Sequence, residues 1–145
     1  MGLDQYLYAR KYVGLQMEDQ YKAIVSELNL EGLDRSASFP HLTVEICCAS
    51  WRNNFAIDGF FDVACEGREF DDEVLVELLD RIEKTLAAYA AGDVALCEEL
   101  LSPDGDYSFV GDVPVDQRYC DELLETKQQL TDLVGKDLAF VYRAG

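Results

Sequence analysis

The segment from Glu73 to Ala91 constrains the fold more than any other part of the chain. Its apolar side chains recur at nearly ideal helical spacing and form one stripe. That stripe consists of Val74, Leu75, Leu78, Leu79, Ile82, Leu86 and Tyr89. Asp71 or Asp72 is placed to cap the first turn, and Gly92 follows the last one. The pattern predicts a long amphipathic helix with one face against a hydrophobic core.

Four further stretches predict helices by spacing and end signals. They are Met17 to Leu28, Trp51 to Cys65, a short helix capped by Asp93 and ending at Leu101, and Pro114 to Val134. The helix from Trp51 to Cys65 is apolar around most of its circumference, so we expect it at the centre of the core. Ser50 is the predicted cap of this helix, and Trp51 is expected in its first turn.

Strand patterns occupy much of the remaining chain. They cover Leu3 to Gly14, His41 to Ser50 and Leu138 to Arg143, with a short edge strand expected at Tyr107 to Val110. This order of elements predicts an α+β fold. Its small mixed or antiparallel sheet, of about three to four strands, is covered by about four to five helices. The length of 145 residues fits a single globular domain spanning residues 1–145.

The charge balance is strongly acidic, with 12 Lys and Arg against 29 Asp and Glu, a net charge of −17. Residues 51–100 alone hold 4 basic and 13 acidic side chains, a balance of −9. An aromatic content of 11% argues against an acidic disordered chain. Such a field repels nucleic acid and anionic membranes and favours basic partners, so neither direct nucleic-acid binding nor membrane binding is expected.

The middle and C-terminal helices supply the candidate partner-binding carboxylates. This acidic face comprises Asp58, Asp62, Glu66, Asp71, Asp72, Glu73, Glu77, Asp80, Asp116, Asp121, Glu122 and Glu125. One interpretation is a solvated surface that keeps the protein soluble. The other is that carboxylates along helices imitate a phosphate backbone and occupy the nucleic-acid groove of a basic protein. Both interpretations stay open at the level of sequence.

No enzyme motif accompanies the charge. A phosphate-binding GxxxxGK[ST] loop, a dinucleotide-binding GxGxxG turn and an HExxH zinc motif are all missing from the sequence. Asp58, Asp62 and Glu66 recur every four residues and would line one helix face, where carboxylates can bind a divalent cation. A solvated face explains that stripe more simply. We therefore predict no catalytic residue, no metal site and no cofactor.

A second class of function comes from aromatic residues near basic and amide side chains. This candidate ligand pocket comprises Tyr6, Tyr8, Arg10, Trp51, Arg52, Asn53 and Tyr107. Core packing accounts for most aromatic clusters. The alternative is a module that binds or sequesters a small, nucleotide-like molecule between the rings, with the arginines as anchors.

The five cysteines, Cys47, Cys48, Cys65, Cys97 and Cys120, are odd in number and include no CxxC pair. Free, buried thiols in a reducing compartment are the expected state. The first residues lack the basic start and apolar run of a secretory signal, which favours the cytoplasm.

Two stretches carry a resemblance to a known family. Met1-Gly2-Leu3-Asp4-Gln5-Tyr6-Leu7-Tyr8 resembles the MGLDxYLY start of a group of small uncharacterised proteins of tailed bacteriophages and prophages. Trp51-Arg52-Asn53-Asn54-Phe55-Ala56-Ile57, followed by Phe60-Phe61, is similar to their WRxxxAIxxWF segment. Asp106-Tyr107-Ser108-Phe109 ahead of an acidic helix resembles their C-terminal part. The chain departs from the group at Asp58, where those proteins tend to have His.

The resemblance implies a phage or prophage origin and the cytoplasm of a bacterial host cell, and it brings no activity. Together with the charge, it leads us to expect a non-enzymatic protein that binds a basic host protein surface. A nucleic-acid-mimicking inhibitor of a host defence complex, with an anti-CRISPR-like role, is the most specific form of this expectation. The small-molecule binding module described above is the alternative.

Overall fold

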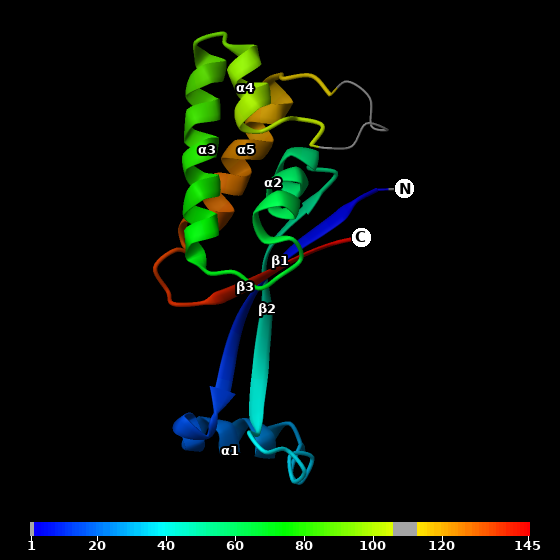
Figure 1. Ribbon diagram of the computed structural model, residues 1–145, viewed down its shortest axis with the longest axis vertical. Helices are drawn as coiled ribbons and strands as arrows, with labels where there is room; N and C mark the ends of the chain where they lie inside the picture. Colours follow the sequence, from blue (N-terminus) through cyan, green and yellow to red (C-terminus); the bar gives the residue numbers. More distant parts are fainter. Residues whose placement is uncertain (1, 106–112) are drawn as a thin grey trace. The chain divides into compact units, whose positions relative to one another are not determined.

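The computed structural model describes residues 2–105 and 113–145. Within them the chain forms a three-stranded antiparallel sheet in the order β2-β1-β3 and five α-helices (Figure 1). The strands are β1 (Asp4–Gly14), β2 (His41–Arg52) and β3 (Ala139–Ala144). The helices are α1 (Glu18–Glu27), α2 (Phe55–Cys65), α3 (Asp72–Ala90), α4 (Val94–Leu100) and α5 (Gln117–Thr131), with a short 3-10 helix η1 (Leu15–Met17). The predicted α+β fold is confirmed.

Contacts within the chain divide it into two compact units. Unit 1 comprises Met1–Ala9 and Cys47–Gly145, and unit 2 comprises Arg10–Ile46. Strands β1 and β2 contribute residues to both. The single domain expected over residues 1–145 stays a prediction.

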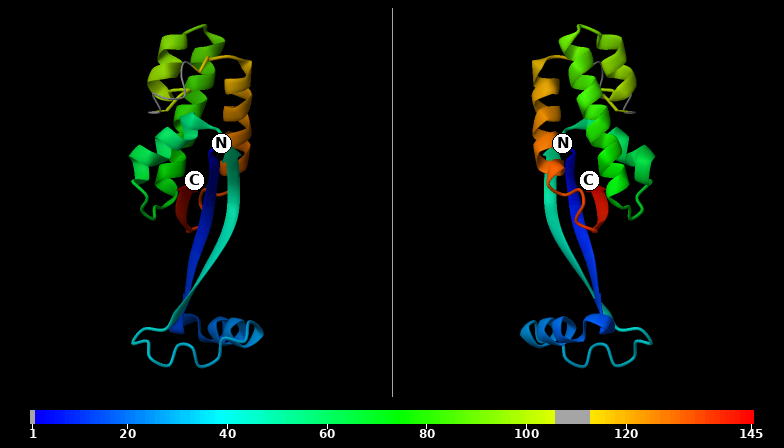
Figure 2. Two further views of the ribbon diagram at one scale, coloured as in Figure 1. Left: turned by 90° about the vertical axis from the view of Figure 1, so that its right-hand side faces the viewer. Right: turned by 90° about the vertical axis from the view of Figure 1, so that its left-hand side faces the viewer.

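Unit 1 contains the main core, and α3 is its longest element. α3 packs against α4 and α5, and Figure 2 shows α3 and α5 side by side in both views. Leu75, Leu78 and Ile82 of the predicted stripe are fully buried, which confirms the expected core face of this helix. Among the described helices, none combines the length and apolar character needed to cross a bilayer.

Phe61 lies at the centre of an aromatic cluster in unit 1. Its ring stacks on Tyr142 with centroids 4.5 Å apart, and it contacts Phe60 at 5.5 Å, Phe70 at 5.6 Å and Trp51 at 6.2 Å. Stacked and edge-on rings at these separations add to the stabilisation from apolar burial. The expectation that the apolar helix lies in the core is confirmed for α2.

The boundary between β2 and α2 differs from the prediction. Trp51 belongs to β2, which continues to Arg52, and Asn54 rather than Ser50 caps α2 by accepting from the Ile57 N–H at 3.3 Å. Asn53 takes a left-handed backbone conformation (φ 56°) between the two elements. Its side chain accepts a hydrogen bond from the N–H of Leu3 at 2.7 Å, a contact 50 residues away in sequence. This long-range contact helps to fix the turn after Arg52.

Unit 2 consists of the C-terminal part of β1 and the N-terminal part of β2, with η1, α1 and the loop that follows α1. Tyr21 is its buried aromatic residue, and the Tyr21 hydroxyl donates to the carboxylate of Asp34. Arg10 forms an ion pair with Glu45 across the two strands. The predicted short strand at Tyr107 to Val110 lies outside the described residues.

Candidate functional site

Asp58 was expected on the acidic face, and the structure corrects this. It is only 4% exposed and accepts a hydrogen bond from the hydroxyl of Tyr142 on β3. The position falls on the inner side of α2, which packs against the sheet and the aromatic cluster. The three-carboxylate stripe is thereby broken, because Asp62 and Glu66 are exposed while Asp58 is not. Among the described residues, no group of three or more His, Cys, Asp or Glu is arranged to hold a metal ion.

The Tyr142 hydroxyl also accepts a hydrogen bond from Nε2 of Gln5, at 2.9 Å. The Gln5 amide in turn bonds both backbone groups of Asn54: Nε2 donates to its carbonyl at 2.9 Å, and Oε1 accepts from its N–H at 2.8 Å. Gln5 is fully buried, and partners of this kind are what allow polar groups to stay inside a core. The network therefore joins β1, β3 and the start of α2.

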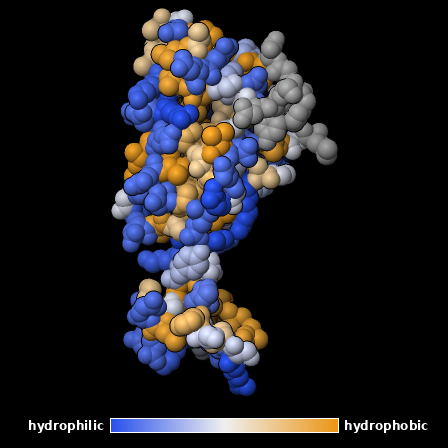
Figure 3. All heavy atoms as spheres, in the orientation of Figure 1, coloured by the Kyte–Doolittle hydropathy of each residue, from blue (hydrophilic) through white to orange (hydrophobic). Residues whose placement is uncertain are grey.

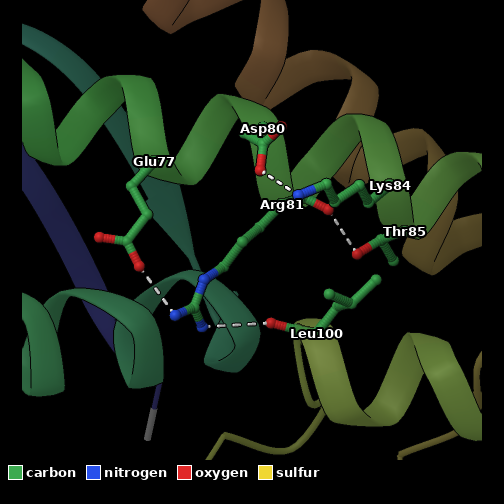
Figure 4. A network of polar contacts seen from close by, with 6 residues as sticks. All are labelled: Glu77, Asp80, Arg81, Lys84, Thr85 and Leu100. Atoms are coloured by element: carbon green, nitrogen blue, oxygen red, sulfur yellow. Dashed lines mark hydrogen bonds and ion pairs between the residues drawn. The ribbon is translucent and has the colours of Figure 1, made fainter.

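Four predicted carboxylates of the acidic face are neutralised locally by ion pairs. The pairs are Glu66–Arg68 (2.5 Å), Glu77–Arg81 (2.8 Å), Asp80–Lys84 (2.7 Å) and Glu122–Arg118 (3.0 Å). Figure 4 shows the two pairs on α3, where Arg81 also donates to the carbonyl of Leu100 at 3.5 Å. Exposed pairs of this kind add little stability, but each reduces the local negative charge.

Three more of the predicted residues have structural roles. Asp71 caps α3 by accepting from the Glu73 N–H, and Asp116 caps α5 by accepting from the Tyr119 N–H, both at 3.0 Å. Asp72 accepts from the N–H of Gly135 at 2.8 Å. Their carboxylates still contribute negative charge, although their positions are set by the helix ends they stabilise.

The remaining four members of the predicted set, Asp62, Glu73, Asp121 and Glu125, are exposed, and among the described residues they neither cap a helix nor form an ion pair. Unit 1 holds 8 basic and 23 acidic side chains, a balance of −15, whereas unit 2 holds 4 and 6, a balance of −2. In the view of Figure 3, hydrophilic residues cover much of the surface of unit 1. The negative charge is therefore concentrated in one unit.

The structure brings together part of the predicted aromatic pocket. Tyr6, Trp51 and Arg52 line a recess of about 400 Å³ in unit 1. Its other lining residues are Asp4, Ser50, Asn54, Glu122 and Glu125. We call this cavity the Trp51 recess. It lies where β1, the end of β2 and α5 meet.

The other predicted pocket residues lie elsewhere. The ring of Tyr8 lies under the guanidinium group of Arg143, with 4.8 Å between the Arg143 Cζ and the ring centroid. Arg10 belongs to unit 2, where it pairs with Glu45, and Asn53 forms the turn after β2. Tyr107 lies outside the described residues.

The charge of the Trp51 recess differs from that of a phosphate site. Arg52 shares the recess with three carboxylates, those of Asp4, Glu122 and Glu125, and its Nε lies 3.9 Å from Asp4 Oδ1. Three acidic groups against one basic group disfavour a nucleotide phosphate and favour a cation. Sequence reasoning missed Asp4 and Asn54 as lining residues, although both lie within the two family-like segments that carry Tyr6 and Trp51.

The cysteines are free, and three of them, Cys65, Cys97 and Cys120, are buried as expected. Burial raises the pKa of each of these three thiols. Cys48 is half-buried, its thiol donates to the carbonyl of Leu7 at 3.3 Å, and burial raises its pKa too. Cys47 is exposed, which corrects the expectation of burial for this residue.

Comparisons of the chain with protein-family models, with curated proteins and with solved structures give no match. The functional proposals below therefore rest on the residues and geometry of the chain itself, together with the sequence resemblance given above.

Proposed function

We propose that this protein acts by binding a basic surface of a partner protein through the carboxylates of unit 1. The observation that carries the proposal is the uneven charge, −15 in unit 1 against −2 in unit 2. Charge complementarity of this size speeds association and selects basic partners, and it weakens as salt rises.

The partner class that fits best is a nucleic-acid-binding protein of a bacterial host. Such proteins present Lys and Arg to phosphates, and a surface of exposed carboxylates competes for the same side chains. The resemblance to tailed-phage proteins supports a role as an inhibitor of a host defence complex in the host cytoplasm. Asp62, Glu73 and Asp121 are the best candidates for direct contacts, because they are exposed and outside local ion pairs.

A pull-down from bacterial lysate, with the immobilised full chain, tests this proposal. We expect a nucleic-acid-binding protein to be retained, to dissociate between about 50 and 200 mM salt, and to be displaced by duplex DNA. The triple variant Asp62→Asn, Glu73→Gln, Asp121→Asn reduces the acidic charge by three and should weaken retention strongly.

The matched control is Asp19→Asn, Glu27→Gln, Glu31→Gln, which neutralises three exposed carboxylates of unit 2. Both variants have the same net charge, so a difference between them reports position rather than total charge. Retention of only neutral or acidic partners, or equal weakening by the two triple variants, contradicts the proposal.

A further inference from the structure

The Trp51 recess combines features that suit one kind of ligand. Two aromatic side chains, Tyr6 and Trp51, line it together with the carboxylates of Asp4, Glu122 and Glu125. Aromatic faces attract cations through their quadrupole, and carboxylates bind guanidinium groups through paired hydrogen bonds. Its volume of about 400 Å³ exceeds what one side chain fills.

The carboxylates in the recess are only partly satisfied. Glu122 pairs with Arg118 at 3.0 Å, and Asp4 lies 3.9 Å from Arg52, whose side chain is 71% exposed. Glu125 is exposed and forms no ion pair among the described residues. The residues that line the recess thus hold a surplus of two negative charges, three acidic against one basic.

Asn54 supplies an independent observation on the wall of the recess. It is only 5% exposed, and its side-chain Nδ2 has no hydrogen-bond partner among the described residues. Its Oδ1 is used in capping α2, so the unsatisfied group is a donor. Buried donors in proteins are nearly always paired, and because Asn54 lines the recess, an acceptor supplied by a bound ligand would satisfy this one.

We infer that the Trp51 recess binds an arginine side chain presented by the partner. The guanidinium group pairs with Glu125 and Asp4 beside the aromatic rings, and a backbone carbonyl of the same residue is the acceptor that suits Asn54. Arginine fits better than lysine because its planar group both stacks on rings and forms paired hydrogen bonds. This inference rests on the proposed function, since it names the partner side chain that unit 1 recognises.

Trp51 is the only tryptophan of the chain, so its fluorescence reports on the recess directly. The probe is N-acetyl-arginine N-methylamide, titrated into the full chain, with the corresponding citrulline compound as its neutral isostere and the lysine compound as a second cation. We expect a saturable change in Trp51 emission with the arginine probe, weaker binding of the lysine probe and none of the citrulline probe.

Single variants separate the recess from general charge effects. Glu125→Gln should weaken binding of the arginine probe roughly tenfold, as for loss of one charge-assisted pair. Arg52→Gln should strengthen it, because it removes the cation that competes for the same carboxylates. Glu31→Gln, an equal change of charge at an exposed carboxylate of unit 2 outside the recess, should leave binding unchanged.

The inference is overturned by an unsaturable response, by equal binding of the citrulline or lysine compound, or by equal weakening in Glu125→Gln and Glu31→Gln. The two proposals fail separately. A basic partner retained by the full chain without a Trp51 response removes the recess assignment alone. A specific Trp51 response without any basic partner in the pull-down removes the proposed function alone.

Discussion

The indole Nε1 of Trp51 donates a hydrogen bond to Oγ1 of Thr126, 2.9 Å away, and so connects β2 to α5. Thr126 is fully buried, and its hydroxyl donates a hydrogen bond to the carbonyl of Glu122 at 2.8 Å. The Trp51 ring also contacts Phe61 in the aromatic cluster. One side chain therefore joins the end of the sheet, the helix that carries Glu122 and Glu125, and the core of unit 1.

Trp51→Ala should lower the free energy of unfolding by about 3 kcal/mol, the lower end of the range for large aromatics, because Trp51 is half-buried. Trp51→Phe keeps a six-membered aromatic ring but loses the indole hydrogen bond. We expect it to lower the free energy of unfolding by about 1 kcal/mol. Urea denaturation followed by circular dichroism measures both. Arg52→Ala, at an exposed neighbouring position, should change stability by less than about 0.5 kcal/mol. An equal loss in Trp51→Ala and Arg52→Ala contradicts this account.

Tyr142→Phe should lower the free energy of unfolding by about 1–3 kcal/mol. The substitution removes the hydroxyl that accepts from Gln5 and donates to Asp58 in a buried network. The same chemical change at the exposed Tyr6 should stay within about 0.5 kcal/mol. Thermal or urea unfolding of both variants tests the difference. Tyr142→Phe as stable as the original chain would mean that the network adds no net stability.

Thiol labelling should distinguish the cysteines by exposure. Cys47 is exposed, whereas burial raises the pKa of Cys65, Cys97 and Cys120 and lowers their thiolate fraction near neutral pH. With a chromogenic disulfide reagent in native buffer, we expect Cys47 to react fast. The three buried thiols should react only after the protein is denatured. Cys47→Ser should abolish the fast phase. A fast phase that survives this substitution would show that another thiol is accessible.

Stability should fall at alkaline pH because buried acids keep their protons in the folded state. Burial raises the pKa of Tyr119, whose hydroxyl donates to the carbonyl of Leu101, and of three buried thiols. The unfolded chain loses these protons from about pH 8.5 for Cys and about pH 10 for Tyr. Above these values the folded state binds more protons, so the free energy of unfolding decreases as pH rises. The urea concentration at the unfolding midpoint, measured at increasing pH from pH 7, checks this prediction. A midpoint concentration that increases with pH above about pH 9 contradicts it.

The sequence predicts the regular elements of this fold well where local periodicity is dense. The predicted helix from Glu73 to Ala91 is found as α3 with ends shifted by one residue, because many apolar positions define its stripe. The predicted start of α2 was wrong. Ser50 and Trp51 fit the pattern of a helix start and equally that of a strand end. The contact that decides between them joins Leu3 to Asn53, and no local pattern reports it.

The candidate sites were harder to predict for the same reason. Asp58 is buried because Tyr142, 84 residues away, supplies its hydrogen bond. The Trp51 recess needs α5 beside the ends of β1 and β2, so the joint role of Glu125 and Trp51 exists only after folding. Composition predicted the acidic character of the surface, but the partition of charge between the two units depends on which segments pack together.

The two hydrogen bonds between the Gln5 amide and the backbone of Asn54 have a consequence for strand alignment. A β-strand that slips by one residue turns every side chain to the opposite face of the sheet. In β1 such a slip would bring Tyr6 to the position of Gln5, so the N–H of Asn54 would lose its partner and its carbonyl would keep only the N–H of Asp58. The amide of Gln5 therefore fixes the register of β1 in the sheet. This register keeps Leu7 in the core and Tyr6 at the surface.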